Sequence, residues 1–277
     1  MTRKFDSYDD YKRHLKNKYG VGEGINYKPW LTIRDVKGKN AFRSIVKGIT
    51  TGRKHHFLSS IETQLFYILE FNKNTIDIRE QFPLDPEKTS NISERAGIPH
   101  PAVSGVAQIM TTDFLVDLLN NGKVIQIAIS VKYENELEDE RVVEKQELER
   151  RYWESIGVKW YIFTENEVPP TLIQNIKWLI PQMHSFDLNQ DDQFTVFNVI
   201  NEALLTYPED KIAVVMKILD QKYQAEGGTY LSYLRHLLAQ NAFAWDVVNI
   251  SHKALTTGQL KASEHWISKE YEYVHAQ

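Results

Sequence analysis

The sequence predicts an α/β (α+β) protein in which helices flank a mixed sheet and a smaller, mostly helical domain follows. Residues 111–134 alternate as two strands joined by a tight turn, and residues 158–164 are an apolar strand that follows a charged helical stretch. From Phe186 onward the apolar residues follow helical spacing instead. We therefore expect a first domain over residues 1–183 and a second over residues 184–277.

Composition excludes several classes of protein. A chain of 277 residues with 42% hydrophobic residues can bury a sizeable core. The absence of cysteine excludes disulfides, cysteine-ligated zinc and thiol nucleophiles. No apolar run reaches the length of a membrane span, and no apolar signal segment follows the first residues, so we expect a soluble, cytoplasmic protein without a membrane partner.

Charge is distributed unevenly along the chain. Residues 1–54 carry 14 Lys/Arg against 5 Asp/Glu, a net of +9, whereas residues 187–277 carry 7 Lys/Arg against 12 Asp/Glu, a net of −5. A basic leading segment can attract a polyanion, although such segments often serve solubility alone. The acidic end is better suited to contact protein than DNA.

The first hundred residues predict a mixture of short helices and strands. A helix is expected over about residues 8–18, two short strands around Gly48 and Gly52, and a helix over 59–72 that carries Glu62 in its first turn. Residues 74–85 alternate like a strand, which predicts Ile76 and Ile78 inward and Asp77, Arg79 and Gln81 outward. A short helix after Pro86 is expected to end at Gly97.

The hairpin at 111–134 has a register that the sequence specifies. Asn121-Gly122 favours a two-residue type I′ turn, so Asn120 pairs with Lys123 and opposed residue numbers sum to 243. Asp113 then lies across from Ser130, about 5 Å away, with Lys132 on the same face. Taken alone, this stretch is better explained by a solvated hairpin face that carries an Asp and a Lys by chance. The opposite face is expected in a core, through Phe114, Val116, Leu118, Ile127, Ile129 and Val131.

The remaining elements complete the two domains. A charged helix over about 139–155 is expected to present Glu144, Glu147 and Glu149 to solvent, with the alternative that one of them joins a site. Residues 169–179 predict a further helix. Helices near 190–206, 208–223 and 228–240, followed by a short β-like hairpin, fit a winged-helix domain or a plain helical interaction domain equally.

The order of these elements resembles the core of the PD-(D/E)xK nucleases, which have the restriction-endonuclease-like fold. In this chain the order is a helix with the acidic Glu62, a strand, a strand with Asp113, a strand ending Ser-Val-Lys, a helix and a strand. The resemblance is closer still to the TnsA family, the endonuclease subunits of heteromeric TnsA/TnsB cut-and-paste transposases. It runs through most of residues 27–180 and is carried by "YKPWLTI", "TGRKHHFLSSIE", "IDIREQFPLD", "TTDFLVD", "EKQELERRYW" and "WYIFT".

The resemblance implies a metal-dependent active site. Glu62, Asp113 and Lys132 would be catalytic, and Mg²⁺, with Mn²⁺ as a substitute, would be held by Glu62, Asp113, Ser130 and the backbone carbonyl of Val131. Lys132 would orient the attacking water or stabilise charge on the phosphate. Ser130 departs from the pattern, since the wider class has Asp or Glu there and the TnsA family commonly has Gln. A short neutral hydroxyl predicts weaker metal binding.

The resemblance also implies a substrate and partners. Double-stranded DNA at transposon ends would be cut at its 5′ ends, and we expect Arg53, Lys54, Arg79 and Gln81 to contact it. A TnsB-like DDE transposase would cut the 3′ ends, and a TnsC-like ATPase regulator would contact the C-terminal domain. The alternatives are a stand-alone restriction or repair nuclease and a non-catalytic DNA-bound adaptor that kept the fold.

Overall fold

The computed structural model describes residues 8–36, 42–183 and 190–267 and divides into two units, Met1–Val168 and Pro169–Gln277. The division precedes the expected boundary because helix α5 (Pro170–Leu179) belongs to the second unit. Asn175 on α5 donates its side-chain N–H groups to the carbonyls of Val247 and Ile250, at 2.8 and 2.9 Å. These bonds tie α5 to the C-terminal part of the chain.

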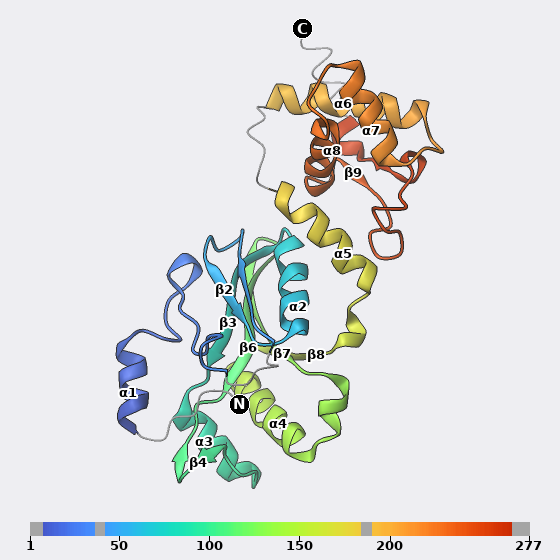
Figure 1. Ribbon diagram of the computed structural model, residues 1–277. Helices are drawn as coiled ribbons and strands as arrows, with labels where there is room; N and C mark the ends of the chain where they lie inside the picture. The colour runs from blue at the N-terminus through green and yellow to red at the C-terminus, as the bar shows by residue number, and fades with distance from the viewer. Residues whose placement is uncertain (1–7, 37–41, 184–189, 268–277) are drawn as a thin grey trace. The chain divides into compact units, whose positions relative to one another are not determined.

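The first unit is built on a four-stranded mixed sheet in the order β3-β6-β7-β8 (Figure 1). The strands β3, β6 and β7 are antiparallel, and β8 runs parallel to β7 after the helix α4. A parallel pair needs such a crossover, because a tight turn can join only antiparallel neighbours. The bounds are Thr75–Pro83 (β3), Thr111–Asn120 (β6), Lys123–Val131 (β7), Glu140–Ser155 (α4) and Lys159–Phe163 (β8).

The β6–β7 hairpin has the register that the sequence predicts. Asn120 pairs with Lys123 and Phe114 with Ile129, so opposed residue numbers sum to 243. Asn121 and Gly122 have φ angles of 49° and 75°, as a type I′ turn requires. The turn thus sets the register of β6 and β7, and the register determines which of their side chains point to each face of the sheet.

Both faces of the sheet are buried. Helix α2 (Ser60–Phe71) covers one face, where its apolar side chains pack on Phe114, Val116, Ile129 and Val131. Helix α4 covers the other face through Leu148 and Trp153. The crossover between β7 and β8 places α4 there, so the face that carries Asp113 and Ser130 is not a solvated hairpin surface.

The prediction that Asp77, Arg79 and Gln81 point outward is wrong, because the N-terminal segment covers β3. All three side chains are buried. The segment around η1 (Gly24–Asn26) donates a backbone N–H to Asp77 Oδ2, at 3.1 Å. A register shift between Thr75 and Asp77 also leaves Ile76 44% exposed, while Ile78 is buried as expected.

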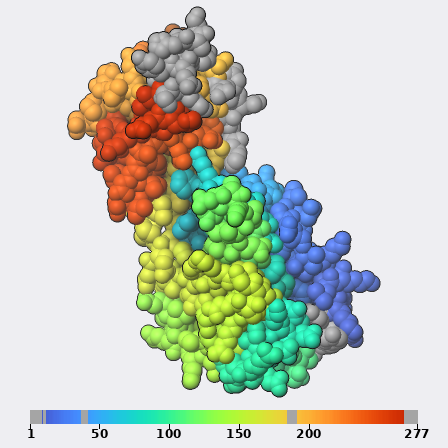
Figure 2. Space-filling view, turned by 180° about the vertical axis from the view of Figure 1, so that it is seen from behind, coloured from blue at the N-terminus to red at the C-terminus, as the bar shows by residue number. Residues whose placement is uncertain are grey.

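Shorter elements surround this sheet. The strands β1 and β2 pair antiparallel, as predicted, and α3 begins after its N-cap Asp85 and ends at Gly97, whose φ is 66°. Figure 2 shows α3 beside α4 on one face of the unit. The bounds are Tyr8–Lys16 (α1), Ser44–Lys47 (β1), Lys54–Phe57 (β2), Pro86–Ala96 (α3), Ala102–Val103 (β4), Val106–Ala107 (β5), Glu134–Glu138 (η2) and Glu165–Glu167 (η3).

The second unit is a helical domain with one short antiparallel strand pair. Its helices surround a core that includes Phe197, Val215, Leu234 and Phe243. No helix in the described parts of the chain is long and apolar enough to cross a membrane. The bounds are Ile180–Gln182 (η4), Gln190–Thr206 (α6), Ile212–Lys222 (α7), Thr229–Ala239 (α8), Phe243–Ala244 (β9), Thr257–Gln259 (η5) and Lys261–Ala262 (β10).

Candidate active site

Glu62, Asp113 and Lys132 meet where α2 begins, β6 begins and β7 ends. All three line a cavity of about 360 Å³, which Gln81 and Glu149 also line. A second cavity of about 300 Å³ shares the same three side chains. The structure therefore brings together the three residues predicted to be catalytic, although they are far apart in the sequence.

Glu62 is held at the start of α2. Its backbone N–H bonds to the side-chain oxygen of the N-cap Ser59 at 3.1 Å, and its carboxylate accepts the backbone N–H of Leu58 at 3.1 Å. Burial, and after it the nearby charge of Asp113, raise the pKa of Glu62 from 4.5 to about 8. In the absence of a metal ion, a pKa of about 8 favours the protonated form of this carboxyl group at neutral pH.

Asp113 is fixed to the end of strand β7. Its Oδ2 accepts the backbone N–H of Val131 at 2.7 Å and the ammonium of Lys132 at 3.2 Å. Its Oδ1 accepts the side-chain amide of Gln81 at 3.1 Å. Each carboxylate oxygen therefore has a defined direction before any substrate arrives.

Lys132 stands inside this acidic group. Its Nζ also donates to the Val131 carbonyl at 2.7 Å. Burial lowers the pKa of Lys132, but the charges of Asp113, Glu149 and Glu62 outweigh burial, and the net shift is upward. Lys132 is therefore a charged ammonium and cannot itself ligate a metal ion.

The expectation that Glu149 faces solvent is wrong. Glu149 is buried, and Ser130 donates its hydroxyl to both of its carboxylate oxygens, at 2.8 Å each. Ser130 is buried and lines neither cavity described above, so its role as a metal ligand stays a prediction. Burial raises the pKa of Glu149 to about 7, and the charge of Asp113 adds to this shift.

Sequence patterns contain only a weak signal for the burial of Glu149. Its carboxylate also accepts the hydroxyl of Thr112 at 2.7 Å and the indole N–H of Trp160 at 3.2 Å. Glu144, Glu147 and Glu149 lie within six residues of a charged helix, and only the packing of α4 decides which one faces the sheet. Glu147, for comparison, pairs with Arg150 and Arg151 at the surface.

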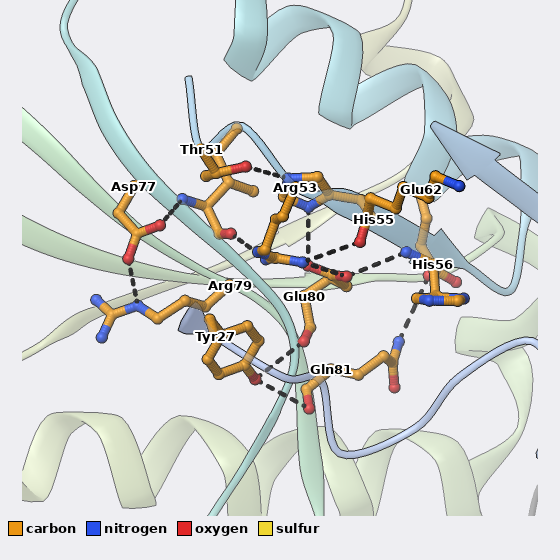
Figure 3. Close-up of polar contacts among 12 residues, drawn as sticks. Tyr27, Thr51, Arg53, His55, His56, Glu62, Asp77, Arg79, Glu80 and Gln81 are labelled. Atoms are coloured by element: carbon orange, nitrogen blue, oxygen red, sulfur yellow. Dashed lines mark hydrogen bonds and ion pairs between the residues drawn. The ribbon is translucent and has the colours of Figure 1, made fainter. Parts of the chain in front are cut away.

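Two arginines expected on DNA are engaged inside the protein. Arg53 forms a two-pronged ion pair with the buried carboxylate of Glu80, at 2.9 and 2.5 Å, and His55 bonds to the same carboxylate at 2.8 Å (Figure 3). Arg79 pairs with Asp117 at 2.5 Å. Both guanidinium groups are buried, because the N-terminal segment and the β1–β2 hairpin cover β3.

Glu80 is the centre of this buried network. Burial by itself would raise the pKa of Glu80, but hydrogen bonds from His55 and Arg53 outweigh it and lower the pKa to about 2. The network attaches β2 to β3, and β2 leads directly into the Leu58 N–H that holds Glu62. Of the four residues predicted to contact DNA, Lys54 alone has an exposed side chain in the described structure.

The donor set suits a hard divalent cation. Among the described residues, no three His, Cys, Asp or Glu side chains converge closely enough to hold an ion by themselves. Mg²⁺ usually takes only one or two carboxylates and completes its shell with water and substrate phosphates. Glu62 and Asp113 supply two carboxyl groups, the backbone of Val131 supplies a carbonyl, and all three residues line the same cavity.

Comparison with known proteins identifies the family. A model described as TnsA-like endonuclease N terminal matches residues 72–165, and one described as TnsA endonuclease C terminal matches residues 167–247. The chain belongs to the TnsA endonuclease family. It is also 37% identical over 262 residues to the transposon Tn7 transposition protein TnsA of Escherichia coli, covering 95% of this chain and 94% of that protein.

The TnsA matches agree with the structure in two respects. They divide near residue 166, close to the division between the structural units at Val168. The N-terminal match contains Asp113, Lys132 and Glu149, whereas Glu62 precedes it. The chain is thus an endonuclease subunit of DNA transposition, with the family's two domains in the family's order.

Proposed function

We propose that this TnsA-family chain is a Mg²⁺-dependent endonuclease that cuts the 5′ ends of a transposon during cut-and-paste transposition. The observation that carries the proposal is the convergence of Glu62, Asp113 and Lys132 on one cavity. Two carboxyl groups beside an ammonium are the groups that metal-assisted phosphodiester hydrolysis needs.

Each side chain has a distinct role in this proposal. Mg²⁺, when bound, lowers the pKa of a bound water and polarises the phosphate. Asp113 and Glu62 would hold the cation, with the Val131 carbonyl as a further oxygen ligand. Lys132 stabilises the negative charge that develops on the phosphate oxygens. The charges of Asp113 and then Glu149 raise the pKa of Lys132 against the effect of burial and keep it charged.

The partners follow from the family and from the charge distribution. The substrate is double-stranded DNA at transposon ends, in the cytoplasm, attracted by the basic N-terminal segment with Lys54 at its surface. A TnsB-like DDE transposase cuts the 3′ ends, and a TnsC-like ATPase regulator docks on the acidic C-terminal unit. Mn²⁺ substitutes for Mg²⁺ in this scheme.

The test compares transposition products made with the wild type, Lys132→Ala and the control Lys123→Ala. Lys123 lies on the same strand but is exposed at the hairpin turn. The Lys132→Ala variant should still assemble and allow 3′ joining, which leaves 5′ strands attached and gives branched donor–target fusions. Lys123→Ala should give simple insertions. Simple insertions at wild-type frequency from Lys132→Ala would overturn the proposal.

Two alternative functions give different results. A non-catalytic adaptor would bind DNA but take up no Mn²⁺ in isothermal titration. A stand-alone nuclease would cut at full rate without the transposase. A buried carboxyl group with a raised pKa, held beside Asp113 and a charged lysine, is costly to maintain in an inactive site, which favours the catalytic proposal.

A further inference from the structure

Gln81 contacts both carboxylates proposed to hold metal. Its side-chain Nε2 donates to Asp113 Oδ1 at 3.1 Å and to Glu62 Oε2 at 3.4 Å. The side chain is buried, and the Thr111 hydroxyl donates to its Oε1 at 3.3 Å. One amide group is therefore oriented from its oxygen and joins two acidic side chains from different elements.

The backbone at Gln81 adopts a conformation that serves this contact. Its φ is 49°, which a non-glycine residue adopts rarely and at an energetic cost. The Trp30 backbone N–H donates to the Gln81 carbonyl at 3.1 Å, and the Tyr27 hydroxyl donates to the Glu80 carbonyl at 3.1 Å. Figure 3 shows Tyr27 against the backbone at Glu80 and Gln81, with the Gln81 side chain directed toward Glu62. The N-terminal segment thus fixes the direction in which the amide points.

We propose that Gln81 is a positioning residue that prearranges Glu62 and Asp113 for a divalent cation; this inference rests on the proposed function. The two carboxyl groups come from different elements, α2 and β6, and the Gln81 amide is a donor that both accept, so it sets the position of one group relative to the other. An amide supplies two N–H donors and carries no charge, so it orders the carboxylates without competing electrostatically with the cation as a lysine would. Partners of this kind commonly control metal affinity.

The experiment measures Mn²⁺ binding to the full chain by isothermal titration. Gln81→Met keeps the size of the side chain and removes the amide. Gln81→Asn keeps the amide and tolerates the positive φ, but it is too short to reach both carboxylates. Both variants should raise the Kd for Mn²⁺ by about 10-fold to 100-fold. The control Gln126→Met, on the exposed end of β7, should leave Kd unchanged.

A cleavage assay at varied Mn²⁺ concentration adds a second readout. Both Gln81 variants should need more metal for half-maximal cutting and should recover rate at high metal. A purely structural role would lower the unfolding temperature but leave the Kd at the wild-type value, and that result would overturn the inference. If Gln81→Met fails to fold, the Kd of Gln81→Asn decides.

Asp113→Asn separates this inference from the proposed function. If Asp113→Asn loses Mn²⁺ binding while both Gln81 variants keep the wild-type Kd, the inference about Gln81 fails and the metal site stands. If the wild type binds no Mn²⁺, or Asp113→Asn binds it equally well, the proposed metal site itself fails.

Discussion

Replacing Glu62 with glutamine should flatten the pH dependence of the free energy of unfolding. The folded Glu62 carboxyl has a pKa of about 8, against 4.5 for an unperturbed glutamate. Between these values the folded chain holds a proton that the unfolded chain has released. The stability due to that proton is complete below about pH 4.5 and is lost as the pH rises through about 8. The neutral amide of Glu62→Gln has no proton to lose.

The size of the effect follows from one proton. Each pH unit costs about 1.4 kcal/mol per proton taken up on folding. From about pH 5.5 to about pH 7.5, the wild type should therefore lose about 2 to 3 kcal/mol relative to Glu62→Gln. The variant keeps an oxygen that can accept the Leu58 N–H, so the comparison isolates the charge.

Urea denaturation at several pH values measures the difference. Glu147→Gln is the matched control, because hydrogen bonds from Arg150 lower the pKa of Glu147 to about 2 and the group stays ionised in both states over this range. Its pH profile should run parallel to that of the wild type. Histidine titrations contribute to all three proteins and cancel in the differences.

Adding Mg²⁺ should change the wild type in the opposite direction. A cation held by Glu62 and Asp113 favours the ionised carboxylates, so it should stabilise the wild type more at about pH 7.5 than at about pH 5.5.

Without added metal, a wild-type profile that runs parallel to that of Glu62→Gln would show that Glu62 carries no such proton. The account of the buried carboxyl group would then be refuted.

Two further substitutions test the fold around the site. Arg53→Met should destabilise the first unit by about 3 to 5 kcal/mol in urea denaturation, because it leaves Glu80 buried with part of its compensation removed. Lys54→Met, on the exposed neighbour, should change it by less than about 0.5 kcal/mol. In thermal melts, Gly122→Ala should cost about 1 kcal/mol, since its φ is 75°. Gly227→Ala, in open space without a positive φ, should cost less. A stability loss in Lys54→Met equal to that in Arg53→Met, or an unchanged melting temperature in Gly122→Ala, would contradict these assignments.

Local chemistry in the sequence determined the hairpin and the elements around it. Asn121-Gly122 requires a type I′ turn, the turn sets the register, and alternation then assigns Phe114 and Ile129 to the α2 core. The N-cap Asp85 and Gly97 likewise set the ends of α3. These features depend on residues close together in the chain, so the sequence alone specified them. The residues that meet at the cavity, by contrast, were predicted from the family resemblance.

Only the tertiary structure decided how the polar side chains are used. Alternation predicted that Arg79 and Gln81 face outward, but it carries no information on whether another segment covers that face. The N-terminal segment does cover it, which pairs Arg79 with Asp117 and turns Gln81 toward the carboxylates. The choice of Glu149 over its neighbours depends in the same way on how α4 packs. Contacts between distant segments determine which side chains are buried and which partners they have. For Arg53 and Arg79, such contacts decide whether the side chain forms a buried ion pair or is free to contact DNA.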